Sequence, residues 1–412
     1  MNSHLKSSIK TISLAQVFLF SAVICLSQSA LAGPKKKIIF GNEFTFSNQE
    51  MLDSFSQDRN GMPVHYSDYS RKKVDRVANA LNKLKADRTG SEKMTIEHSA
   101  GSSIHVEYPD GFKFKIYGEP GILEVNTSPH SYEEYLELTE RINRDIFEVM
   151  ENVGLQPQDF TGGGHIHVGG AGLFDDPILV RNFIVDFMNH SELSSSDLPE
   201  IPPFEEGGAS LKPKAAILDQ TWVNAVGIND LGQPNVKGLK KAISEFDKIE
   251  NPSVSALRDL IMQKAQGPNV NPGPDPVYVN GFGGWGTRPT KYHDLNLRPL
   301  SDNVDSATVE IRSIRPQKNF DEFLRLAQMF QARIEFLKKK TTRVPVKVLP
   351  SPKLAQEAIE RFSIYLAESG LDIEDYLFLE HPAWRITQEF SKFVDSCSNS
   401  IRTKLRKPIS NE

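Results

Sequence analysis

The sequence predicts an α+β fold with a mainly antiparallel sheet. Short segments between residues 94 and 125 alternate apolar and polar side chains, which is typical of antiparallel strands. Longer segments before and after them carry apolar residues at helical spacing. The order of strands, helices, long loops and further strands differs from the regular alternation of a parallel βαβ fold. We therefore expect one antiparallel sheet with flanking helices and a helical C-terminal region.

The first half of the chain supplies most of the expected strands and two helices. A strand runs from Lys37 through Phe46, and residues 70–87 have the apolar spacing of a helix. Pro109-Asp110-Gly111 has the composition of a hairpin turn between two short strands. Ser131 to Glu134 forms a capping-box pattern at the start of a strong helix, which Gly154 ends.

The second half combines helices with long loops. Asp176-Pro177 begins a helix, with Asp as N-cap and Pro in the first turn. Residues 191–214 and 267–289 are rich in Gly, Pro and Ser, and we expect them to be loops that frame a cleft. Within the second loop, the glycine-rich segment 281–286 fits a mobile lid and a plain flexible loop equally well. Further elements are expected as strands at 292–297 and 308–314, a long helix from Asn319 to about Lys340, and helices over 351–406 with breaks near Gly370 and Pro382.

Two histidines stand two residues apart between glycine clusters, in the segment 162–170. On an extended strand His165 and His167 project from one face, and Ile166 and Val168 from the other, toward a core. Two imidazoles on one strand face indicate a metal or a charged ligand. A structural role for at least one of them fits the pattern equally well.

Glu43 lies on a strand that is otherwise rich in phenylalanine. Phe40, Asn42, Phe44 and Phe46 share one face, and Glu43 and Thr45 share the other. A glutamate between phenylalanines is costly to bury unless something pairs with it. The alternative is a half-exposed strand with Glu43 in water.

A second acidic segment surrounds residues 117–129. If a strand resumes at Ile122, then Ile122, Glu124 and Asn126 share a face. Glu119 fits a turn carboxylate and a functional role equally well.

Two adjoining segments toward the C-terminus, both expected as strands, carry the remaining candidates. The first, residues 291–299, contains Asn296 and Arg298. In the second, residues 308–315, Glu310 and Arg312 lie on one face. They can pair with each other, or the carboxylate can hold a cation and the guanidinium a phosphate.

The sequence excludes several common metal, nucleotide and nucleophile sites. A cupin needs a glutamate where Ala171 and Gly172 stand, and a metallo-β-lactamase-type site needs an acid in place of Gly169. The chain has no cysteine pair for structural zinc, no Walker-type motif and no Gly-x-Ser-x-Gly elbow. The available Glu, His, Asn and Arg side chains favour Mg²⁺ or Mn²⁺.

The ordered set of motifs resembles the amidoligase family, the carboxylate–amine ligases related to glutamate–cysteine ligase and glutamine synthetase. The motifs are Gly-x-Glu, Glu-x-Asn-x-Ser-Pro, Gly-x-His-x-His, Leu-Asn-Leu and Thr-Val-Glu-Ile-Arg, within residues 38–337. The resemblance implies a curved antiparallel sheet of the glutamine synthetase type. It also implies that ATP phosphorylates a carboxylate and that an amine then attacks the acyl phosphate.

The resemblance also implies roles for individual residues. Metal ligation is expected of Glu43, Glu124, Glu310 and His165, and nucleotide binding of Arg312, Asn296, Arg298 and Arg315. The expected catalytic residues are Arg312, His165 and His167, with Arg312 stabilising the transferring phosphoryl group. The family's first motif is usually Glu-x-Glu, and here Thr45 stands at the second acidic position. Either one metal site is weakened, or Glu119 substitutes.

Residues 1–32 have the pattern of a secretory signal peptide. Lys6 and Lys10 precede a mostly apolar segment over 14–26, and Ala30-Leu31-Ala32 fits a cleavage site, so we place cleavage after Ala32. An uncleaved membrane anchor is the alternative, although polar residues interrupt the apolar segment. We thus expect an exported protein, periplasmic or secreted. Its predicted parts are the signal, an amidoligase-like domain over 33–345 and a helical extension over 346–412.

Charge and cysteine content narrow the expected partners. Removing Lys6 and Lys10 with the signal leaves 46 basic and 53 acidic side chains, a net charge of −7. This mild acidity argues against a nucleic-acid surface. Loss of Cys25 leaves Cys397 alone, which excludes an intrachain disulfide, and we expect Cys397 to be a semi-buried helix residue. We expect carboxylate and amine substrates, no stable membrane insertion, and an oligomer as one option.

Two other functions remain compatible with the same residues. A non-catalytic binding protein on this scaffold would hold a small anion or peptide, as Thr45 and the export signal suggest. An ATP-dependent enzyme is unexpected in a compartment that lacks ATP, unless the protein is delivered into another cell. A metal-dependent amide hydrolase is the third possibility.

Overall fold

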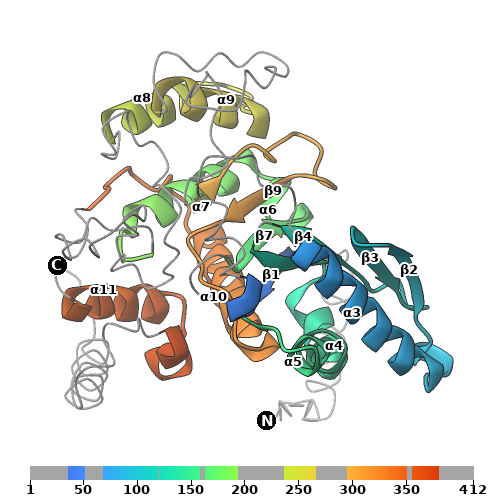
Figure 1. The fold of residues 1–412 in the computed structure, drawn as a ribbon. Helices are drawn as coiled ribbons and strands as arrows, with labels where there is room; N and C mark the ends of the chain where they lie inside the picture. The colour runs from blue at the N-terminus through green and yellow to red at the C-terminus, as the bar shows by residue number, and fades with distance from the viewer. Residues whose placement is uncertain are drawn as a thin grey trace, which may run out of the picture. The chain divides into compact units, whose positions relative to one another are not determined.

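The computed structural model describes residues 36–51, 68–119, 121–157, 163–193, 236–265, 295–349 and 355–379. The chain divides into two units, residues 1–37 and residues 38–412, and all elements described below belong to the second unit. An antiparallel sheet with flanking helices organises this unit, which confirms the α+β class (Figure 1). The predicted signal peptide lies outside the described residues.

The sheet has the strand order β2-β3-β4-β5-β1-β7-β9-β8, and β6 pairs with one end of β1. Every pairing among the described strands is antiparallel. The first strand in the sequence therefore lies in the interior of the sheet, between β5 and β7. The strands are β1 Ile39–Ser47, β2 Thr95–Ser99, β3 Ser103–Glu107, β4 Lys113–Glu119, β5 Ile122–Thr127, β6 Gln156–Pro157, β7 His165–Gly169, β8 Leu295–Asn296 and β9 Thr308–Ile311.

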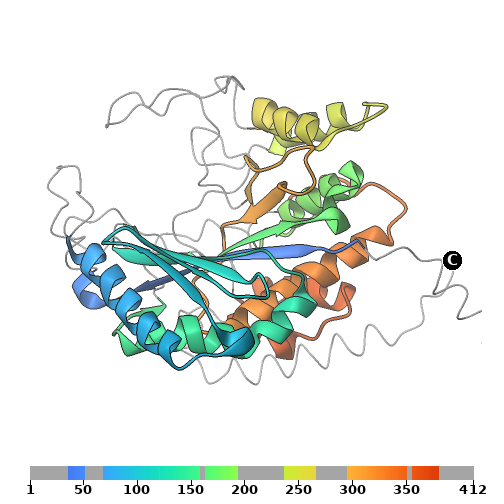
Figure 2. The same ribbon diagram turned by 90° about the vertical axis from the view of Figure 1, so that its right-hand side faces the viewer.

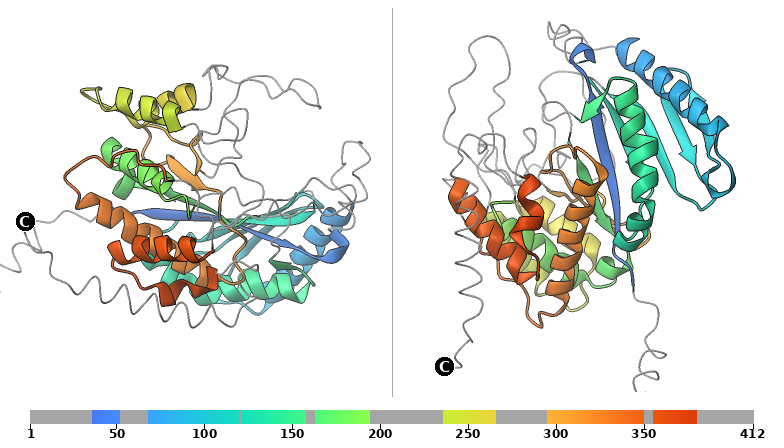
Figure 3. Two further views of the ribbon diagram at one scale, coloured as in Figure 1. Left: turned by 90° about the vertical axis from the view of Figure 1, so that its left-hand side faces the viewer. Right: turned by 90° about the horizontal axis from the view of Figure 1, so that it is seen from below.

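Helices pack against the apolar face of this sheet. Figures 2 and 3 show α3 alongside the β2–β5 part of the sheet, with α4 and α10 on the same side. The helices are α3 Asp68–Ala86, α4 Tyr132–Ile142, α5 Glu148–Asn152, α6 Ala171–Phe174, α7 Pro177–Asn189, α8 Val236–Phe246, α9 Val254–Ala265, α10 Phe320–Lys338 and α11 Ala355–Glu368, with 3₁₀ turns at Gly90–Glu92 and Ile373–Leu379 and a π-helical turn at Asn143–Phe147.

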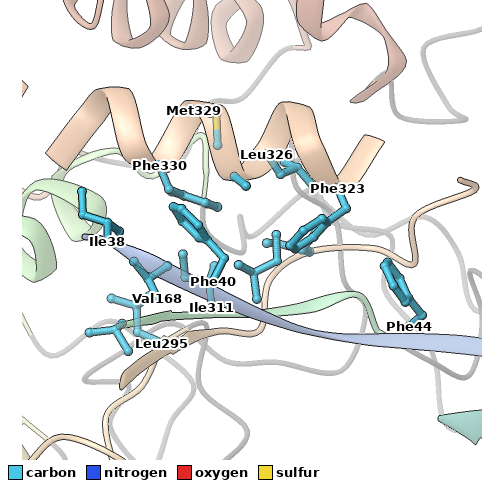
Figure 4. Close-up of a cluster of buried hydrophobic side chains, with 14 of the residues drawn as sticks. Ile38, Phe40, Phe44, Val168, Leu295, Ile311, Phe323, Leu326, Met329 and Phe330 are labelled. Carbon is cyan, nitrogen blue, oxygen red and sulfur yellow. The ribbon is translucent and has the colours of Figure 1, made fainter. Parts of the chain in front are cut away.

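The alternation along β1 separates the core from the polar face. Phe40, Phe44 and Phe46 are all buried, in agreement with their predicted common face. Figure 4 shows Phe40 and Phe44 on the side of β1 that faces α10. The ring of Phe44 makes edge contacts with Phe320 and Phe323 of α10, at centroid distances of 6.2 and 5.9 Å. Such aromatic packing contributes apolar burial and fixes ring geometry. The opposite face of β1 carries the polar side chains of Glu43 and Thr45.

Local sequence signals determine the turns and helix ends as predicted. Gly111 has φ 92° in the β3–β4 turn, where a side chain would be strained. The Ser131–Glu134 capping box is complete, Asp176 accepts from the Ile178 backbone, and Asn319 caps α10. These caps satisfy backbone donors that helix starts otherwise leave unpaired.

A wider turn interrupts the helix that the sequence predicts over 131–153. Residues 143–147 adopt a π-helical turn. Within it the buried Asp145 accepts a 2.6 Å hydrogen bond from the Tyr108 hydroxyl and pairs with Arg88 and Arg144. The paired carboxylate ties this helix to the β3–β4 turn.

The C-terminal helices pack on the domain through one buried arginine. Arg333 of α10 donates two 2.7 Å hydrogen bonds to Asp186 of α7 and one of 2.8 Å to Glu368 of α11. This arginine thus links α10 to α7 and α11, and the expected division of the chain at residue 345 stays a prediction. Gly370 follows α11 with φ 79°, as the predicted break requires.

Some predicted elements differ from the structure, and others fall outside the described residues. Helices α8 and α9 were not predicted, and β9 ends at Ile311, three residues early. Among the described helices, none has the length and apolarity needed to cross a bilayer. Most of the two long loops, the start of the strand at 292, Pro382 and Cys397 lie outside the described residues.

Candidate metal centre

Strand register brings the predicted polar residues together on one face of the sheet. Glu43 of β1 lies opposite His165 of β7, and His167 lies opposite Glu310 of β9. Glu310 in turn lies opposite Asn296 of β8. Four strands, β1, β7, β9 and β8, thus contribute polar side chains to one face of the sheet. The predicted facing of both histidines, with Ile166 and Val168 in the core, is confirmed.

Glu43, His167 and Glu310 form a group that can hold a metal ion. One ligand atom from each residue lies within 4.8 Å of the other two. Glu43 and Glu310 belong to the predicted ligand set, and His167 was expected nearby. Glu124 and His165, the other two predicted ligands, lie outside this group, and their ligation stays a prediction.

His165 lies between the two carboxylates of the group. Its Nδ1 is 2.5 Å from Glu43 Oε2 and 3.6 Å from Glu310 Oε1. Its Nε2 is buried and has no hydrogen-bond partner among the described residues. A buried imidazole nitrogen without a partner carries a desolvation cost, which a bound group would remove. The centre therefore offers a second imidazole beside the three-residue group.

The histidines hold Glu43 in its charged form. Burial alone would raise the pKa of the Glu43 carboxyl, but hydrogen bonds and charge from His165 and His167 hold it well below its usual range. Burial lowers the pKa of His167, yet its hydrogen bond to Glu43 and the charges of Glu310 and Glu43 raise it above its usual value. A carboxylate that is already ionised is a ready cation ligand.

Glu310 is oriented by two donors. Asn296 Nδ2 and Arg312 Nη1 both donate to its carboxylate. Of the two open interpretations of Glu310 and Arg312, direct pairing is present in this structure. The pairing also places a guanidinium beside the metal group, where anionic oxygens would be held.

The other predicted nucleotide residues lie in different surroundings. Arg298 is exposed, and its backbone N–H donates to Asn296 Oδ1. Arg315 is buried and pairs with Glu322 in the first turn of α10, at 3.0 Å. Since this ion pair connects the end of the β9 segment to a helix, Arg315 has a clear structural role.

Glu124 belongs to a neighbouring polar cluster on β4 and β5. It accepts a hydrogen bond from the Tyr117 hydroxyl, to which Asn126 also donates at 3.1 Å. Tyr117 was missed by the sequence reasoning, although alternation along residues 113–119 places it on this face. Glu119 is half-buried on β4, opposite Ile122, and lies outside the metal group.

Thr45 occupies the position where the resembling family usually has an acid. It is buried, lies opposite Glu124 and donates a 3.2 Å hydrogen bond to the carbonyl oxygen of Gly163. Gly163 precedes the histidine strand. Thr45 therefore positions the segment that leads into His165, which is a structural use of this site.

Comparison with known proteins identifies no family for the chain. No family model matches the sequence, and no curated protein matches it. Two solved structures of GmaS, one without ligand and one of the GmaS/ADP complex, resemble the fold with 13% identity and a TM-score of 0.37. They cover 88% and 91% of this chain, which corresponds to 72% and 76% of theirs. Likeness at this level identifies no activity for this chain.

Proposed function

We propose that the protein is an ATP- and divalent-metal-dependent carboxylate–amine ligase that forms an amide or peptide bond. The observation that carries the proposal is the group of Glu43, His167 and Glu310, with Arg312 bonded to Glu310, on the polar face of an antiparallel sheet. This is where the family resemblance expects metal and nucleotide. Glu43 and Glu310 belong both to this group and to the ligand set that the resemblance implies, and His167 joins them in the group.

The donor set fits Mg²⁺ or Mn²⁺. Two carboxylates and an imidazole suit these ions, and Mn²⁺ accepts imidazole more readily than Mg²⁺ does. When bound, the ion would supply positive charge to neutralise phosphate oxygens. Glu43, Glu310 and His167 would hold it, with His165 or Glu124 as further ligands.

The chain's own residues would position the reacting groups. Asn296 and Arg312 fix the Glu310 carboxylate, while His165 and His167 keep Glu43 ionised. The Arg312 guanidinium would face the transferring phosphoryl group, whose negative charge spreads over its equatorial oxygens. Catalysis of this type depends on positioning and charge, so no covalent protein nucleophile is needed.

The proposed reaction has two steps. A carboxylate oxygen of one substrate attacks the γ-phosphorus of ATP, and ADP leaves. The nitrogen of the amine substrate then attacks the carbonyl carbon of the acyl phosphate, inorganic phosphate leaves and the nitrogen loses a proton. The products are an amide, ADP and phosphate.

Export and partners complete the proposal. Cleavage after Ala32 would place the mature protein in the periplasm or outside the cell. There it would need delivery to an ATP-containing compartment in order to turn over. Its partners would be small-molecule or peptide carboxylates and amines rather than nucleic acids.

The direct test combines nucleotide binding and turnover. The complete mature chain, residues 33–412, would be titrated with ATP by calorimetry in the presence of Mg²⁺ or Mn²⁺. Phosphate release would be followed in a separate assay with panels of carboxylates and amines. We expect metal-dependent ATP binding and amine-dependent phosphate release, both lost in Glu310→Gln. Absence of nucleotide binding with either metal would exclude the ligase.

The second candidate function is a non-catalytic binding protein. It is favoured by Thr45, which stands at the family's second acidic position and forms a buried hydrogen bond to Gly163 instead. Because Thr45 supplies no charge, the site has one carboxylate fewer than the family pattern. That function predicts thermal stabilisation by ligand without turnover. An amide hydrolase would instead show metal-dependent cleavage that is independent of ATP.

A further inference from the structure

A hollow lies on the polar face of the sheet, over the strands next to β1. It has a volume of about 430 Å³ and lies over strands β2 to β5. Glu97, His105, Lys113, Lys115 and Asn126 are among the residues that line it. None of the roles proposed above uses these residues.

Register connects this hollow, here called the β2–β5 pocket, to the metal centre in one straight row. His105 of β3 lies opposite Lys115 of β4, Lys115 opposite Asn126 of β5, and Asn126 opposite Glu43 of β1. Two strand spacings separate Lys115 from Glu43, a distance of about 10 Å. A ligand that reaches both must be elongated, like a peptide of about three residues.

The two lysines of the pocket differ in their ion pairing. Lys113 is paired with Glu107 at 2.9 Å. Lys115, in contrast, lies over the Tyr117 ring, 5.3 Å from its centroid, and forms no ion pair among the described residues. Lys115 is therefore the cation best placed to receive a negative group, with His105 directly across from it.

The acidic residues of the pocket limit the charge of that group. Glu107 is neutralised by Lys113, and Glu97 lies on β2 opposite His105. Their presence keeps the pocket near neutrality, which favours a singly charged carboxylate over a phosphate dianion.

Asn126 forms the wall between the pocket and the centre. Its Nδ2 donates to the Tyr117 hydroxyl, and its Oδ1 is buried without a hydrogen-bond partner among the described residues. A buried amide oxygen without a donor favours a ligand that brings an N–H or O–H past this point. The pocket thus offers a cation at one end and an acceptor on the path to the metal centre.

We propose that the β2–β5 pocket binds a free carboxylate at the far end of an elongated substrate, with Lys115 and His105 as specificity-determining residues. The substrate class is then a dicarboxylate or short peptide, with one carboxylate at the metal centre and another about 10 Å away. This inference rests on the proposed ligase function, because it names the substrate of the same face.

The test compares suberate with its monoamide, which differs from it by one carboxylate and has a comparable length. Binding to the full mature protein would be measured by calorimetry in Mg²⁺ without nucleotide. We expect the wild-type protein to bind suberate about tenfold more tightly than the monoamide. Lys115→Gln and His105→Gln should each reduce this preference, while thermal melting shows that both variants remain folded.

Lys83→Gln is the matched control, because it removes the same charge from an exposed position on α3 and should leave the preference intact. Equal binding of suberate and monoamide, or an unchanged preference in Lys115→Gln, would overturn the inference. Inorganic phosphate that binds more tightly than suberate and depends on Lys115 would overturn the carboxylate assignment. If the protein prefers suberate but binds no ATP, the carboxylate site stands and the ligase function is excluded. If the protein turns over but shows no preference for suberate, the ligase function stands and the carboxylate site is excluded.

Discussion

His165 Nδ1 lies 2.5 Å from Glu43 Oε2, across the pairing of β7 with β1. The two residues are 122 positions apart in the sequence. Their contact joins the histidine motif to the first strand, and the same carboxylate also contacts His167 at 3.3 Å. Glu43 is thus the residue on which both imidazoles converge.

Metal binding should depend on the two carboxylates of the centre. Glu43→Gln and Glu310→Gln should each weaken Mn²⁺ binding at least about tenfold, because each removes one charged oxygen ligand. Calorimetric titration of metal-free protein measures this. Glu137→Gln, an exposed change on α4, is the control and should bind as the wild type does. Unchanged Mn²⁺ affinity in both site variants would contradict the assigned centre.

Replacing His167 and replacing His165 should affect different properties, metal affinity in the first case and stability of the metal-free protein in the second. His167→Gln should reduce Mn²⁺ affinity, since His167 belongs to the ligand group. His165→Ala should destabilise the metal-free protein by about 1–3 kcal/mol, because it removes the imidazole that lies between two largely buried carboxylates. Urea unfolding and metal titration of both variants test this. The reverse pattern would make His165 the ligand, as the sequence resemblance implies.

Adding a second acid at Thr45 should make stability more dependent on metal. Thr45→Glu removes the buried bond to Gly163 and places a carboxylate opposite Glu124, so the metal-free protein should lose about 2 kcal/mol or more. Mn²⁺ should then raise its melting temperature more than that of the wild type. Thr45→Gln controls for side-chain size, and an equal Mn²⁺ response in the two variants would argue against a second metal position here.

The Arg333–Asp186 pair should be sensitive to loss of one partner. Asp186→Leu leaves the Arg333 guanidinium buried beside an apolar side chain, with a cost of about 3–5 kcal/mol. Arg333→Met combined with Asp186→Leu should recover part of that loss, which denaturant unfolding can measure. Lys338→Met removes an exposed ion pair with Glu335 and should change stability by less than about 1 kcal/mol. A double variant no more stable than Asp186→Leu alone would contradict this account.

Glu92 gives the fold a defined pH response. Burial acts to raise the pKa of its carboxyl, but hydrogen bonds and charge from Arg144 and Arg141 hold it below its usual value of 4.5. A depressed folded pKa stabilises the protein above pH 4.5, and this stabilisation is lost as pH falls through the folded pKa. The difference in unfolding free energy between wild type and Glu92→Gln should therefore be present at pH 7 and shrink below pH 4.5. A difference independent of pH would show that Glu92 acts through packing.

Much of the fold could be predicted because local rules govern it. The two-residue period placed Glu43 opposite the face of Phe44 without knowledge of any partner strand. Caps at Ser131 and Asn319 fixed helix starts through bonds within a few residues. Helices α8 and α9 were overlooked between two loop-like segments. The π-helical turn around Asp145 accompanies contacts with Tyr108 and Arg88, which no local rule reveals.

Alternation along the sequence assigns each polar residue to one face of its strand. Which of these residues contact each other depends on how the strands pair in the folded sheet. Strand order and register place His167, rather than His165, in the ligand group with Glu43 and Glu310, and they place Glu124 with Tyr117. Periodicity assigns a side chain to a face but carries no information on which strands pair or in what register. That pairing follows from burial of the apolar face against α3, α4 and α10, a property of the whole sheet.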